Sequence, residues 1–121
     1  MAEITIRGDH LHVGLTRWER VFGLLHETDV PLENVAGVEA LPDPITEVHG
    51  LKAGTGLPNL KLGTWRRPGH TTLAAVRRGQ PGLKVTVSGG HFTELLVSQP
   101  GADAAASTIR ARLEGAAATG R

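Results

Sequence analysis

The chain has 121 residues, of which 40% are hydrophobic and 21% are charged, and it contains no cysteine. This length suits one ordinary folded domain and is too short for two conventional cores. The lack of cysteine excludes disulfides and thiolate zinc sites. Together with the lack of a charged-then-apolar leader, it predicts a cytoplasmic protein. No apolar run approaches the ~20 residues of a membrane-spanning helix.

Charge is distributed unevenly along the chain. Residues 1–50 carry three basic against nine acidic side chains, a net −6, whereas residues 51–100 carry seven basic against one acidic, a net +6. This polarity favours contacts between oppositely charged surfaces, within the chain or between copies. The sequence is not uniformly basic, so no nucleic-acid partner is expected.

The first forty residues predict a hairpin, a short helix and a further strand. Apolar residues alternate with polar or small ones on both sides of Gly8-Asp9, which is typical of a β-hairpin. Thr16 and Glu19 form a capping box, so we expect a helix over residues 17–25, with Trp18 packed between helix and sheet. Residues 35–41 predict the next strand, which two prolines end.

The second half of the chain predicts a meander and a closing helix. Residues 42–58 lack usable periodicity and are interpreted as a long loop. Alternation then predicts a four-stranded antiparallel meander over residues 60–67, 70–78, 83–88 and 91–98. Apolar residues at helical spacing, including Ile109 and Leu113, predict a C-terminal helix that stops at Gly115. The domain is therefore expected to span residues 1–115, with a flexible tail at 116–121.

These elements predict a mainly β fold in which about seven strands form two orthogonally packed antiparallel sheets, capped by the C-terminal helix. Two stretches, residues 15–21 with 30–35 and residues 92–98, carry packing patterns without a catalytic signature. In these stretches the chain resembles the bacterial pleckstrin-homology-like domains, especially the short, free-standing actinobacterial type, over about residues 10–113. The resemblance implies a barrel used for binding or assembly, in a family of which some bacterial members self-associate.

Catalysis has no support in the sequence, so neither enzymatic activity nor a cofactor is expected. Residues 50–56, which include Lys52, lack the Gly-Lys-Ser/Thr ending of a phosphate-binding loop. None of the three serines lies in a Gly-x-Ser-x-Gly turn. His10 and His12 point to the same side of a strand, but a third ligand is not identified. Both are interpreted as solvent-facing side chains, and no metal site is expected.

The predicted function is that of a non-enzymatic binding or assembly module that acts through protein contacts, with a partner or with its own copies. If Arg67 lies opposite His70 across the Pro68-Gly69 turn, Leu73 faces the core and Trp65 faces outward. Trp65, together with Arg66 and Arg67, is therefore the candidate interface. A register shift, or cover from the C-terminal helix, would instead bury Trp65.

The alternative function is peripheral binding of an anionic phospholipid or a phosphorylated ligand through basic hairpin ends, which would place the protein at the membrane surface. The candidate residues are Lys52, Lys61, Arg77 and Arg78. The expected register splits the arginines into two patches ~24 Å apart, and two basic side chains supply only ~2 kcal/mol near an anionic leaflet. Residues 63–65 also echo a triplet of lipocalin-like barrels, but their mid-chain position and the shortage of strands disfavour that fold.

Overall fold

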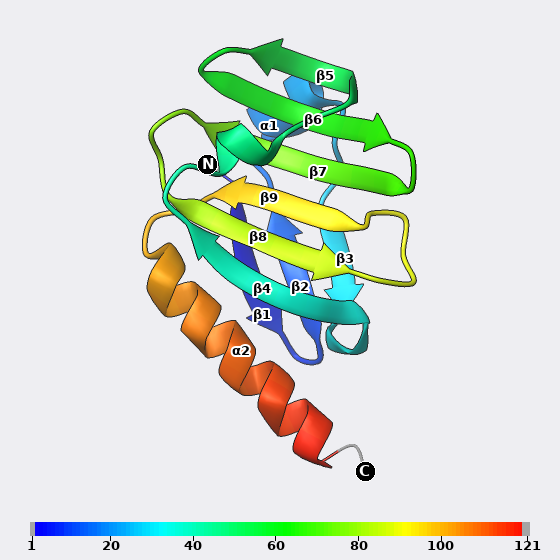
Figure 1. Cartoon of the computed structure of the whole chain (residues 1–121), viewed down its shortest axis with the longest axis vertical. Coiled ribbons are helices and arrows are strands. Elements are labelled where there is room, and N and C mark those ends of the chain that lie inside the picture. Colours follow the sequence, from blue (N-terminus) through cyan, green and yellow to red (C-terminus); the bar gives the residue numbers. More distant parts are fainter. Residues whose placement is uncertain (1, 120–121) are drawn as a thin grey trace.

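The computed structural model describes residues 2–119, which form two packed β-sheets with a long helix along one side (Figure 1). The three-stranded sheet has the order β1-β2-β3, and the six-stranded sheet has the order β4-β8-β9-β7-β6-β5. The strands are β1 Glu3–Arg7, β2 His10–Gly14, β3 Thr28–Pro31, β4 Val35–Leu41, β5 Leu51–Leu57, β6 Leu60–Arg67, β7 His70–Arg77, β8 Gly82–Val87 and β9 Glu94–Ser98. The helices are α1 Arg17–Gly23 and α2 Ala102–Thr119, and the 3-10 turns are η1 Leu32–Asn34 and η2 Pro44–Glu47.

The predicted hairpin, short helix and strand over residues 35–41 are observed, although the helix ends at Gly23 and not at residue 25, because Leu24 adopts a left-handed φ of 54°. β1 and β2 form a hairpin around Gly8, which adopts a φ of 60° that favours glycine. α1 begins with the expected capping box, because Thr16 Oγ1 accepts a hydrogen bond from Glu19 N at 3.2 Å and Glu19 Oε1 accepts one from Thr16 N at 2.9 Å. β4 occupies residues 35–41 as predicted. The four-residue strand β3 was not predicted.

The main core lies between the two sheets. Leu11 and Val13 of the three-stranded sheet are fully buried in the same cluster as Leu73 and Leu95 of the six-stranded sheet. We call the sheet surface that bears these residues the inner face of the six-stranded sheet, and the opposite surface its outer face. Figure 1 shows the strands of the smaller sheet running across those of the larger one.

Helix α2 packs along β4 and closes one side of the core. Ala106 and Ile109 are buried, and Arg110 Nε donates a hydrogen bond to the carbonyl of Val38 at 3.1 Å. The predicted mainly β fold with a C-terminal helix is therefore observed. The predicted stop at Gly115 is wrong, because the helix continues to Thr119. The end of the predicted tail, residues 120–121, lies outside the described residues.

The predicted meander is wrong in its pairing, although its four strands exist close to the predicted ranges. The register of β6 and β7, with Arg67 opposite His70, is confirmed. However, β9 lies between β7 and β8, parallel to β7 and antiparallel to β8. Every residue of β9 is buried, and a strand covered on both faces belongs in the centre of a sheet. The described residues form nine strands rather than about seven.

The interpretation of residues 42–58 as a structureless loop is also wrong. This segment contains η2 and the edge strand β5. η2 places Ile45 and Val48 on the outer face of the six-stranded sheet, in a second apolar cluster with Trp65 and Leu96. Asp43 Oδ1 accepts a hydrogen bond from the Gly79 amide at 3.0 Å and holds the start of the segment. The six-stranded sheet is thus covered on parts of both faces.

Candidate functional site

Large exposed apolar side chains gather on two neighbouring elements, α1 and β5. Among the described residues they are Trp18, Val21, Phe22, Leu24, Leu51 and Leu57. Phe22 is 52% exposed and Leu51 is 84% exposed. We call these six residues the α1–β5 surface. Exposed apolar side chains that cluster in this way are typical of interaction sites.

Helix α1 is held against β5 and β6 by a close approach of backbones. A Cβ atom on Gly54 of β5 would lie 2.8 Å from the carbonyl oxygen of Gly23, and one on Gly23 would lie 3.2 Å from Leu62 Cβ. Thr55 Oγ1 donates a hydrogen bond to the carbonyl of Phe22 at 2.8 Å. The end of α1 therefore rests on the inner face of this hairpin because glycine leaves room for it.

The orientation of α1 exposes its aromatic side. Glu19 and Gly23, one turn apart, are the buried residues of the helix. Trp18 and Phe22 consequently point outward, with ring centroids 4.8 Å apart and planes tilted by 41°. The expectation that Trp18 packs between helix and sheet is wrong, since Trp18 is 49% exposed.

Strand β5 is a long, uncovered sheet edge. It has seven residues and pairs only with β6 among the described strands. At the edge of β1, the side chain of Gln99 occupies the backbone groups of Ile4. Gln99 Oε1 accepts a hydrogen bond from Ile4 N at 2.8 Å, and Gln99 Nε2 donates one to Ile4 O at 3.3 Å. The edge of β4 is covered by α2, and β3 has only four residues. Proteins usually block such edges, so an open one is available for pairing with another strand.

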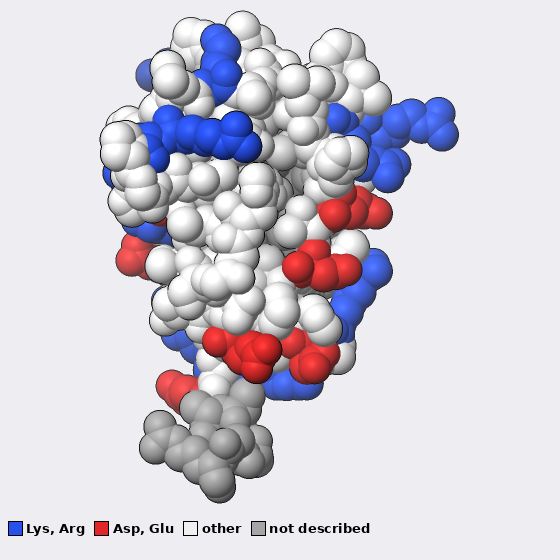
Figure 2. Space-filling model, turned by 90° about the vertical axis from the view of Figure 1, so that its right-hand side faces the viewer, with Lys and Arg blue, Asp and Glu red and all other residues white. Residues whose placement is uncertain are grey.

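The neighbourhood of the α1–β5 surface is positively charged. Basic side chains on α1, β5 and β6 are Arg17, Arg20, Lys52, Lys61, Arg66 and Arg67. The acidic residue of these elements, Glu19, is buried, and its Oε2 accepts a hydrogen bond from Ala2 N at 2.9 Å. Figure 2 shows Lys and Arg without acidic neighbours at the upper end of the molecule, where β5 lies in Figure 1, whereas Asp and Glu lie lower, mixed with further basic side chains.

The structure separates the residues of the predicted interface. Trp65 faces the outer side of the sheet as expected, but it is only 4% exposed because η2 covers it. The prediction that Trp65 is an exposed interface anchor is therefore wrong, and the buried alternative holds, with a different covering element. Arg66 and Arg67 are exposed at the end of β6.

The predicted anionic-ligand residues approach one end of β6, but the register places Lys52 and Lys61 on the outer face and Arg77 on the inner face of the sheet. The side chain of Lys52 runs along β5 over Gly56, which pairs with Lys61. Leu60 pairs with Arg77, so Arg77 lies at the same end of β6 as Lys61. Arg78 follows and donates its amide to the carbonyl of Asn59 at 3.0 Å. Arg67 lies at the opposite end of β6, which is the separation that the register predicted.

Of the two histidines that were expected to face solvent, His12 does not. His12, expected to face solvent, is buried, with Nδ1 2.6 Å from Asp29 Oδ1 and Nε2 3.6 Å from Glu27 Oε2. The neighbouring carboxylates provide the polar partners that allow this burial. His10 Nδ1 lies 2.7 Å from Asp9 Oδ1. Within residues 2–119, no group of three or more side chains is suited to hold a metal ion.

Sequence reasoning missed the α1–β5 surface, although a signal for it exists. In α1, Glu and Gly occupy positions 19 and 23, and such residues form a poor apolar face. The neighbouring positions 18, 21 and 22 carry the large apolar side chains, which the usual expectation places inside. Leu51 and Leu57 were missed because β5 was interpreted as part of a loop.

Comparison with known proteins gives no relative: no family model, curated protein or solved structure matches the chain. No helix of the described residues combines the length and the apolar character needed to cross a membrane.

Proposed function

We propose that this chain is a non-enzymatic protein-binding module that takes up an extended, acidic segment of a partner along the β5 edge. One observation carries the proposal: the large exposed apolar side chains of the described chain border its long open strand edge. Addition of a partner strand to such an edge is a common mode of peptide recognition. Main-chain hydrogen bonds supply affinity in this mode, and alternate side chains supply specificity.

Successive side chains of β5 point to opposite faces of the sheet, and their types indicate which residues a partner segment would need. Leu51, Ala53 and Leu57 lie on the side of β5 that faces α1, because they pair with inner-face positions of β6. Lys52 lies on the other side. A strand added beside β5 would place its own residues alternately on these two sides. Apolar residues would then contact the leucines and α1, and acidic residues would lie near Lys52.

Charge favours a different protein over a second copy. A two-fold interface brings the same surface of each copy together, so the basic residues around β5 would face one another. An acidic partner instead complements them. A lipid surface is disfavoured because acyl chains cannot satisfy the open backbone groups of β5. Peripheral binding to anionic membranes is kept as an outcome of the test.

A pleckstrin-homology-like architecture is part of the proposal. Its support is the resemblance in the sequence together with two packed sheets and a C-terminal helix that buries Ala106 and Ile109 in the core. The parallel pairing of β7 with β9 departs from the all-antiparallel sheets that the resemblance implies. Binding or assembly, without catalysis, is the role that this family suggests.

The proposal is tested with a displayed library of extended peptides in which apolar residues alternate with Glu or Asp, compared with libraries that alternate with Lys or Ser. Acidic members should be enriched, and their affinity should fall as salt increases. Trp18→Ser and Leu57→Ser should weaken binding, whereas Ser substitution of Leu113, which lies away from the surface, serves as a control for reduced stability. Enrichment of basic or neutral peptides contradicts the proposal. Binding to anionic vesicles without peptide binding supports the lipid alternative instead.

A further inference from the structure

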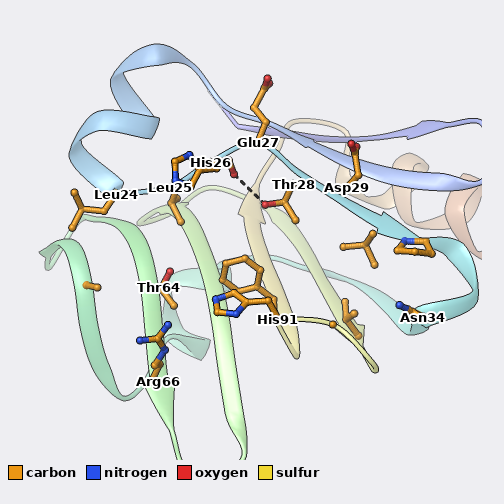
Figure 3. Close-up of a pocket in the computed structure, with 16 residues that line it drawn as sticks. Leu24, Leu25, His26, Glu27, Thr28, Asp29, Asn34, Thr64, Arg66 and His91 are labelled. Atoms are coloured by element: carbon orange, nitrogen blue, oxygen red, sulfur yellow. Dashed lines mark hydrogen bonds between the residues drawn. The ribbon is translucent and has the colours of Figure 1, made fainter.

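A cleft of about 580 Å³ opens between the two sheets (Figure 3). One wall consists of β3 and the connection from α1 to β3. The other consists of β5, β6, the end of β8 and the loop before β9. Its volume lies within the ~300–1,000 Å³ that is typical of small-molecule sites. The cleft lies beside the α1–β5 surface and shares Leu24 with it.

The bottom of the cleft is apolar. Leu25, Val30 and Val87 line it and belong to the main core. Phe92 is half-buried against the same core, and its ring meets that of His91 edge to face at a centroid distance of 4.8 Å. These side chains come from three separate parts of the chain, so the cleft is a feature of the folded domain. An apolar ligand body would find a preformed surface here.

Among the polar residues that line the cleft, Arg66 carries a positive charge. Arg66 and Thr64 stand on the β6 wall, and His91 stands beside them in Figure 3. Glu27 and Asp29 border the opposite wall, but Figure 3 shows their side chains directed away from the cleft. They lie on the far side of β3, where both approach the ring of His12. Among the described ion pairs none includes Arg66, so its guanidinium is available to a ligand.

We infer that the cleft binds a small organic carboxylate with an apolar body, such as a medium-chain or aromatic acid. The planar guanidinium of Arg66 matches a carboxylate and can donate two parallel hydrogen bonds to it. The apolar body then covers Phe92 and the core residues below it. A single arginine suits one anionic group rather than a polyphosphate. This site adjoins the α1–β5 surface, with which it shares Leu24, and its occupant is a free small molecule.

The inference is tested by titrating decanoate, below its micellar concentration, into the isotopically labelled full chain and following backbone amide signals. Saturable shifts are expected at Val87, His91 and Phe92. Decanol, which lacks the charge, and acetate, which lacks the apolar body, should each bind at least about tenfold more weakly. Equal affinity for acetate and decanoate would show that only a surface cation is being titrated, and this overturns the inference.

Matched variants identify the charge that matters. Arg66→Met should weaken decanoate binding by about 10- to 100-fold, whereas Arg67→Met should leave it unchanged. At the exposed mouth position, Ala53→Glu should weaken binding more than the isosteric Ala53→Gln. Unchanged affinity in Arg66→Met contradicts the inference, as do ligand shifts confined to the α1–β5 surface.

Failure of this inference is distinguishable from failure of the proposed function. Trp18→Ser should reduce peptide binding and leave the decanoate titration unchanged. Loss of decanoate binding in Trp18→Ser would place the ligand on the α1–β5 surface and overturn the cleft assignment. Peptide binding without any decanoate binding rejects the cleft site alone.

Discussion

Trp18 and Phe22 stack one helical turn apart on the solvent side of α1, with ring centroids 4.8 Å apart. The helix cannot turn these rings inward without displacing Glu19, which caps the helix and binds Ala2 N, and Gly23, which allows close contact with β6. The way in which α1 packs on the sheet therefore keeps the apolar side chains of Trp18 and Phe22 exposed to solvent. This surface lies beside the open edge of β5, and the two features together form the proposed binding site.

The two tryptophans should contribute very differently to stability. Trp65→Ala removes a buried ring from the cluster beneath η2 and should lower the free energy of unfolding by about 3–5 kcal/mol. Trp18→Ala removes an exposed ring and should change it by less than about 1 kcal/mol. Urea unfolding of both variants measures the difference. Equal losses would place both rings in similar environments and contradict the described burial.

The close approach of β5 to both β6 and α1 predicts a strong effect at Gly54. This residue has a φ of 130°, and an added Cβ would meet the carbonyl oxygens of Leu62 in β6 and of Gly23 in α1. Gly54→Ala should therefore destabilise the fold by about 1–3 kcal/mol. Gly37→Ala is the control, because no atom lies within 4 Å of its added Cβ, and it should have little effect. Equal thermal midpoints for the two variants would exclude the close approach.

Gln99 should be important because it blocks the edge of β1. Its side chain bonds both Ile4 N and Ile4 O in a buried position. Gln99→Leu leaves these backbone groups without that partner and should cost about 1–3 kcal/mol. Gln80→Leu, at an exposed turn, should be nearly neutral. A neutral Gln99→Leu, measured by chemical denaturation, would show that the edge does not depend on this side chain.

The ion pair between Glu47 and Lys84 should add a small stabilisation with a defined pH range. The hydrogen bond from Lys84 Nζ to Glu47 Oε1, 3.1 Å long, raises the pKa of Lys84 above its ordinary value of 10.5. Because the folded pKa is the higher one, this stabilisation is fully present below pH 10.5 and is lost as pH rises through the folded pKa. Both side chains are partly exposed, so Glu47→Gln should cost less than about 1 kcal/mol at neutral pH.

The difference in stability between wild type and Glu47→Gln, followed by thermal unfolding, should remain constant between pH 7 and 10 and shrink above that range. A difference that grows on the alkaline side would have the opposite sign and would contradict the raised pKa of Lys84.

Local features of the sequence predicted local structure well. The capping box at Thr16 and Glu19 located α1, and the Pro68-Gly69 turn set the register of β6 with β7. Both depend on residues that are close in sequence. The order of strands in a sheet does not depend on residues that are close in sequence. Alternating apolar and polar residues show that a segment is a strand, but not which strand lies beside it.

Neither the burial of Trp65 nor the open edge of β5 was predicted, for a related reason. Trp65 was correctly placed on the outer face, but its cover comes from Ile45 and Val48, nearly twenty residues earlier. The i, i+3 spacing of these two residues was too short a signal within a Pro- and Gly-containing segment. The open edge of β5 depends on the position of β5 in the six-stranded sheet, which only the long-range pairing determines.

The most direct test of the proposed function is amide hydrogen exchange of residues 51–57, measured for the full chain alone and with an enriched acidic peptide. Amides of β5 that point away from β6 should exchange readily in the free protein and become protected in the complex, and Trp18→Ser should reduce that protection. Bound peptide that leaves the exchange of β5 unchanged would contradict strand addition at this edge.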